Sequence, residues 1–65
     1  MNLQMLKGKF REKNLNYEEV AKMLSISITT LSNKMNGVSE FTITEVRNLK
    51  DILALEDSEC IKIFL

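Results

Sequence analysis

Apolar residues recur at spacings of three and four along most of the chain, and this spacing predicts short helices that each bury one face. Near the start of the chain, Leu3, Leu6 and Phe10 follow it, and the pattern ends near Asn14. We therefore expect a first helix from about residue 3 to about residue 14.

Capping residues mark the start of the second helix. Asn16 offers a side-chain oxygen to the free amides of a helix start, and Glu19, three residues later, completes something close to a capping box. The apolar face that follows consists of Val20, Ala21, Met23 and Leu24.

A break in the apolar spacing at residues 25–27 separates the second helix from a third. Ser27 is a good N-cap for a helix from about Ile28 to Asn36, in which Leu31 and Met35 lie four residues apart. Gly37 ends this helix, because glycine tolerates the left-handed conformation that commonly follows a helix end.

Two further helices are expected in the second half of the chain. Thr42 and Glu45 form a second capping box, and the segment from Asp57 to Leu65 predicts a short fifth helix with apolar Cys60, Ile61 and Phe64. The apolar face of the fourth helix consists of Ile43, Val46, Leu49 and Leu53. The sequence therefore predicts one all-α domain over residues 1–65, a compact bundle of about five short helices.

Composition argues against catalysis and export. With 65 residues, no histidine and one cysteine, the chain lacks the clustered groups that metal or nucleophilic chemistry requires. We expect no enzyme activity, no metal, no cofactor and no small-molecule substrate, and we expect Cys60 to be a packing residue. The unpaired cysteine and the absence of a long apolar stretch predict a cytoplasmic protein without a membrane segment.

The net charge is zero, yet the charges are unevenly distributed. Residues 1–36 carry six basic and three acidic side chains, whereas residues 37–65 carry three basic and six acidic ones. This asymmetry is compatible with an ordinary solvated surface, and equally with a molecule that presents its basic end to DNA.

The second and third helices, joined by three residues, have the layout in which the later helix projects into a groove about 12 Å wide. Ala21 lies where the two helices must approach closely, Ile26 fills the turn, and Leu31 anchors the third helix. The face of the third helix that remains outward carries Ser27, Ile28, Thr29, Ser32, Asn33 and Asn36.

The stretch LNYEEVAKMLSISITTLSNKMNG, residues 15–37, resembles the helix-turn-helix of the Cro/CI-type, or XRE-type, regulators of phages and bacteria. The similarity rests on the small Ala21, on the regular apolar positions, on the Ser/Thr-rich start of the third helix and on the closing Asn-Gly. It implies a lambda-repressor-like fold with a helix-turn-helix core at 17–37. It also implies a transcriptional regulator that binds double-stranded operator DNA as a homodimer.

The resemblance also implies roles for individual residues. Base reading falls on four positions of the third helix, Ile28, Thr29, Ser32 and Asn33. Contacts to the DNA backbone fall on Asn16, Tyr17, Ser27, Lys34, Asn36, Ser39 and Thr42. Of the basic residues, Lys34 is the first candidate for a phosphate contact, because it belongs to the third helix.

The chain departs from the family pattern at three places. Ser25 stands where glycine is common, and Ile28 and Thr29 stand where the recognition helix commonly begins with glutamine. Phe10 and Met35 replace a buried Arg–Glu pair, so an apolar contact is expected there. The operator sequence therefore cannot be transferred from relatives.

Two questions stay open at the level of sequence. The same helical fold serves in antirepressors or antitoxins that bind another protein and leave DNA untouched, and zero net charge with no arginine on the third helix favours that alternative. In addition, Ile63, Phe64 and Leu65 either form a subunit contact or close the core of their own domain.

Overall fold

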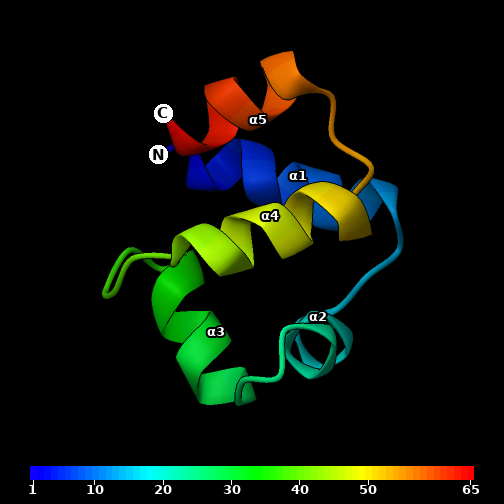
Figure 1. Ribbon diagram of the computed structural model, residues 1–65. Coiled ribbons are helices and arrows are strands. Elements are labelled where there is room, and N and C mark those ends of the chain that lie inside the picture. The colour runs from blue at the N-terminus through cyan, green and yellow to red at the C-terminus, as the bar shows by residue number, and fades with distance from the viewer.

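The computed structural model describes all 65 residues and contains five helices and no strand. In Figure 1, α4 crosses the middle of the molecule, α1 lies behind it, α5 lies above it, and α2 and α3 lie below. The predicted all-helical bundle of five short helices is confirmed. The helices are α1 (Leu3–Glu12), α2 (Tyr17–Met23), α3 (Ile28–Met35), α4 (Ile43–Ile52) and α5 (Asp57–Phe64).

The three predicted N-caps are present. The side chain of Asn16 accepts from the N–H of Glu19 (2.8 Å), Ser27 from that of Thr30 (3.0 Å), and Thr42 from that of Glu45 (3.1 Å). Asn16 and Thr42 belong to complete capping boxes. A side chain of this kind typically contributes about 1 kcal/mol, so the starts of α2, α3 and α4 are fixed locally by the sequence.

Left-handed residues end four of the helices. Gly37 has a φ of +78° and lies two residues after α3, as expected. Asn14, Ser25 and Ala54 have φ values of 56°, 58° and 50° at the equivalent places after α1, α2 and α4. These three positions carry a Cβ in a conformation that glycine adopts more readily.

The hydrophobic core draws side chains from all five helices. Leu6, Val20, Leu31, Leu49 and Ile63 are completely buried, one from each helix. In addition, α2 packs against α3, and α1 against α5. Phe10 and Met35 are both buried in the same cluster, as an apolar replacement of an ion pair requires.

One expectation about a buried face is wrong. Ile43 was expected on the buried face of α4 but is 75% exposed, because it is the first residue of that helix and its side chain lies outside the core cluster. On α5, Ile61 is also exposed, and Ile63 is the residue that enters the core. Ile63 thus closes its own domain, whereas Leu65 is 93% exposed.

Polar contacts fasten α5 to its neighbours. The N–H of Asn2 donates to the carbonyl oxygen of Ile63 (2.6 Å), and Lys9 of α1 forms an ion pair with Glu59.

No helix is long and apolar enough to span a membrane, and no group of acidic, histidine or cysteine side chains is arranged to hold a metal ion. The thiol of Cys60 is half-buried.

Candidate nucleic-acid interface

The helix α3 turns one side to the core and the other to solvent. Leu31 and Met35, four residues apart, are completely buried. On the opposite side, Ile28 is 47% exposed, Thr29, Asn33 and Asn36 are exposed, and Ser32 is half-buried. We call this set of five residues the outer face of α3; it contains all four positions predicted to read bases.

The connection from α2 holds α3 at its start. Ala21 is buried with 2% of its surface exposed, and its carbonyl oxygen accepts from the N–H of Ile26 (3.0 Å). Ile26 packs against the core cluster, as expected for a residue that fills the turn. The outer face therefore sits on a helix that is supported both from behind and at its first residue.

Hydrogen bonds within α3 leave most of the outer face free. The Ser27 hydroxyl donates to the Oγ1 of Thr30 (2.8 Å) while it accepts from the Thr30 N–H, so Ser27 serves as a helix cap. The side-chain amide of Asn36 donates weakly to Ser32 Oγ (3.4 Å). Thr29 and Asn33 make no side-chain hydrogen bond within the domain, which leaves their polar groups open to a ligand.

The start of α2 carries two other predicted backbone contacts. Asn16 is exposed, and its side-chain oxygen is engaged in the cap, so only its NH2 group is open to a phosphate. Tyr17 is half-buried, with its ring edge-on to Phe10 at 5.9 Å between centroids, and its hydroxyl makes no hydrogen bond within the domain. Both residues present donors beside α3.

The position of Lys34 differs from the sequence prediction. Its side chain points into the domain, is only 9% exposed, forms an ion pair with Glu45 of α4 and lies 5.9 Å from the centroid of the Phe41 ring. The prediction that Lys34 contacts phosphate does not fit this position. The sequence contained the signal, because Lys34 follows Leu31 by three residues and therefore belongs to the buried face.

The ion pair affects the ionisation of Glu45. Burial by itself would raise the pKa of this carboxyl, but hydrogen bonds from Lys34 and from the backbone N–H of Thr42 outweigh burial and hold the pKa below its usual value. Glu45 is thus charged at neutral pH and joins the end of α3 to the start of α4.

The remaining two predicted backbone contacts follow α3. Ser39 is exposed and makes no hydrogen bond, so its hydroxyl is available. Thr42 is exposed too, but its hydroxyl oxygen accepts from the N–H of Glu45, whose carboxylate lies beside it. Thr42 therefore caps α4, and its own O–H stays free to donate to a phosphate.

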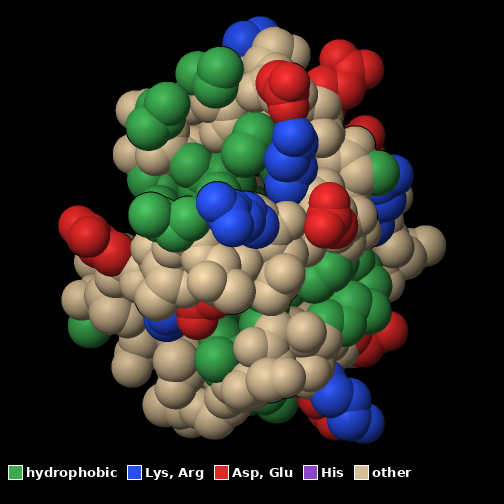
Figure 2. Space-filling model, in the orientation of Figure 1, with side chains coloured by type: hydrophobic (Ala, Val, Ile, Leu, Met, Phe, Trp, Pro, Cys, Tyr) green, Lys and Arg blue, Asp and Glu red, His purple; other side chains and the backbone are tan.

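The outer face of α3 carries no charge. Figure 2 shows the part of the surface over α3 as mostly uncharged, with a basic side chain at the lower right, toward α2. Of the six basic residues in the first half of the chain, Lys9 and Lys34 are engaged in ion pairs. Arg11, Lys13 and Lys22 are exposed and form no ion pair.

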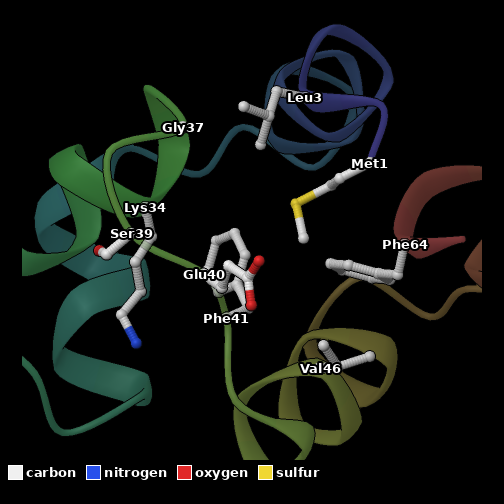
Figure 3. A pocket seen from close by; sticks show the side chains of 9 residues that line it. All are labelled: Met1, Leu3, Lys34, Gly37, Ser39, Glu40, Phe41, Val46 and Phe64. Carbon is white, nitrogen blue, oxygen red and sulfur yellow. The ribbon is translucent and has the colours of Figure 1, made fainter.

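A cleft of about 510 Å³ opens next to the end of α3. Figure 3 shows Lys34 and Ser39 from the α3 side, Phe41 near the middle, and Met1 and Phe64 on the other side. Phe41 packs edge-on against Phe64, with ring centroids 6.1 Å apart. The cleft therefore lies between the C-terminal end of α3 and the two chain ends.

Comparison with known proteins found no matching family model, no similar curated protein and no similar solved structure. The function of this chain is therefore inferred from the geometry of α2 and α3 and from the chemistry of the outer face.

Proposed function

We propose that this chain is a sequence-specific DNA-binding regulator of the Cro/CI type, a helix-turn-helix protein that inserts α3 into the major groove of operator DNA. The observation that supports this best is the division of α3 into two sides. Leu31 and Met35 are completely buried, whereas the outer face is accessible and largely unbonded. A supported helix with a free polar side matches the requirements of major-groove docking.

The residue types on the outer face suit base recognition. The Asn33 amide is able to form paired hydrogen bonds with an adenine edge, and the Ser32 hydroxyl is able to serve several bases. Ile28 is an apolar residue left 47% exposed at the start of the helix. With the Thr29 methyl group, it supplies apolar contact for thymine methyl groups.

Backbone contacts come from a smaller set than the sequence suggested. Asn16, Tyr17, Asn36, Ser39 and Thr42 present free donor groups, while Lys34 is paired with Glu45 and the Ser27 hydroxyl both donates to and accepts from Thr30. With so few cations near α3, binding is expected to depend more on base contacts than on release of counterions. A homodimer compensates by placing two copies of α3 on two half-sites.

Selection of bound sequences from a random duplex library tests the proposal. We expect enrichment of a short, two-fold symmetric motif, and Asn33→Ala should weaken the preferred site by about 1–3 kcal/mol and relax one base position. Asn48→Ala is the matched control, because Asn48 is an exposed asparagine on α4. If no motif is enriched, or if both variants bind like the unmodified chain, the proposal is wrong.

One observation favours a second candidate, a protein-interaction module of the antirepressor or antitoxin kind. The outer face of α3 contains no lysine or arginine, and the net charge is zero. Titration onto random duplex DNA at low and moderate salt separates the two candidates. A regulator should show salt-sensitive binding, whereas a protein-interaction module should show none.

A further inference from the structure

An apolar groove lies between the start of α4 and the end of α5. It measures about 330 Å³, and seven of its eight lining residues are hydrophobic. Ile43 from α4 and Ile61 from α5 stand at its walls with 75% and 56% of their surface exposed. Figure 2 shows hydrophobic side chains gathered in this region, at the upper left. Contiguous exposed apolar surface of this kind usually marks an interaction site.

The groove continues into the cleft beside α3. Phe41, Val46 and Phe64 line both hollows, so the two share an aromatic and aliphatic floor. We call the two hollows together the α4–α5 surface. It includes three charged side chains: Lys34, which is paired with Glu45, and Glu40 and Arg47, which line different hollows.

The charges of Arg47 and Glu40 are opposite, and both are unpaired. Arg47 lines the apolar groove and Glu40 lines the cleft, and neither forms an ion pair within the domain. A two-fold axis that lies in the contact plane and bisects the line between two points at right angles brings each point opposite the other one on the second copy. In that arrangement, Arg47 of each copy faces Glu40 of the other, and the apolar floors meet between them.

We propose that the α4–α5 surface joins two copies of this chain in a two-fold symmetric dimer. The surface is complementary to itself in charge, and two copies of zero net charge do not repel each other as a whole. Stable interfaces bury about 800 Å² per partner. The groove provides the apolar centre of such a contact.

The outer face of α3 lies outside this surface. None of its five residues lines either hollow, and α3 and α5 lie on opposite sides of α4 in Figure 1. Among the residues proposed to contact the DNA backbone, Ser39 lines the cleft, so a dimer contact that extends over the cleft covers it. The dimer forms without DNA, so its test is independent of the proposed function.

Sedimentation of the full chain without DNA, from low to high micromolar concentration, provides the first test. We expect a monomer–dimer equilibrium that Ile61→Lys weakens by about tenfold or more, because the variant places a charge in the apolar centre of the contact. Met23→Lys is the matched control, since Met23 is 52% exposed on α2. Circular dichroism of both variants checks that they are folded.

Charge reversal tests the pairing itself. Glu40→Arg and Arg47→Glu should each weaken the dimer, since each places like charges opposite one another. An equimolar mixture of the two variants should form a heterodimer, because both of its contacts then join opposite charges, and the double variant should regain the homodimer. Glu18→Arg on α2 is the control for the change in net charge.

The outcomes are separable. A chain that stays monomeric at all concentrations overturns the dimer and leaves the groove to a different protein. A dimer that tolerates Ile61→Lys and both reversals overturns the assignment to this surface. A chain that dimerises as expected but binds no DNA supports this inference and contradicts the proposed function.

Discussion

The ammonium group of Lys34 and the carboxylate of Glu45 form an ion pair that ties the end of α3 to the start of α4. The same carboxylate oxygen accepts the backbone N–H of Thr42 at 2.8 Å and so also completes the cap of α4. One side chain thus stabilises a helix start and a contact between helices. It also keeps the only cation of α3 inside the domain.

Removing the charge of Glu45 should destabilise the fold. Glu45→Gln leaves the Lys34 ammonium nearly buried without a counter-charge, so we expect a loss of about 1–3 kcal/mol in the free energy of unfolding. The double variant with Lys34→Met should recover part of this loss, since no charge is then stranded. Urea denaturation of the two single variants and the double variant measures the coupling. If the losses in the two single variants simply add in the double variant, the interaction between Lys34 and Glu45 does not stabilise the fold.

Stability should also fall in acid. Burial raises the pKa of Glu45, but Lys34 and Thr42 lower it more, so the folded-state pKa lies below the usual 4.5. The pKa values of Asp57 and Glu59 are likewise lowered, chiefly by hydrogen bonds from Lys50 and Lys9. A group with a depressed folded-state pKa contributes stability above its unfolded-state pKa and loses it as the pH falls through the folded-state value.

Thermal unfolding at pH values from 7 down to 2 measures this effect. We expect a constant melting temperature above about pH 5 and a decline below it. In Glu45→Gln the decline should be shallower, because one of the three carboxyls no longer titrates. An equally steep decline in that variant would show that titration of Glu45 does not contribute to the loss of stability in acid.

The sequence was sufficient to predict the helix starts because the responsible contacts are local. Asn16, Ser27 and Thr42 each accept a hydrogen bond from a residue three positions later, and Gly37 adopts the left-handed conformation that ends α3. The outer face of α3 could be predicted for the same reason. Once Leu31 and Met35 are assigned to the core, helical geometry fixes the other side.

The errors concern contacts between elements distant in sequence. The position of Lys34 depends on Glu45, eleven residues away and on another helix, and residue type alone favoured a solvated lysine. The sequence also left open whether Ile63 closes its own domain, and this depends on how α5 lies on α1, where the carbonyl oxygen of Ile63 accepts from the N–H of Asn2. Both depend on tertiary packing, which short-range periodicity does not encode.

Ser25 offers a route to a more stable chain. Its φ of 58° lies in the left-handed region, so Ser25→Gly should relieve strain and stabilise the fold by about 0.5–1 kcal/mol despite the greater entropy of unfolded glycine. Ser58→Gly is the control. Ser58 is exposed within α5, where glycine should cost about the same amount. Urea midpoints that shift in the same direction for both variants would contradict the strain argument.

The salt dependence of DNA binding should show that Lys34 does not contact phosphate. Each phosphate contact contributes about 0.9 to the slope of log affinity against log salt concentration. Because Lys34 is paired with Glu45 and only 9% exposed, Lys34→Met should leave this slope unchanged. Glu45→Gln, measured below its melting temperature, frees the ammonium group, so its slope should stay constant or become steeper. A slope that falls by about one in Lys34→Met would place this lysine on the DNA backbone.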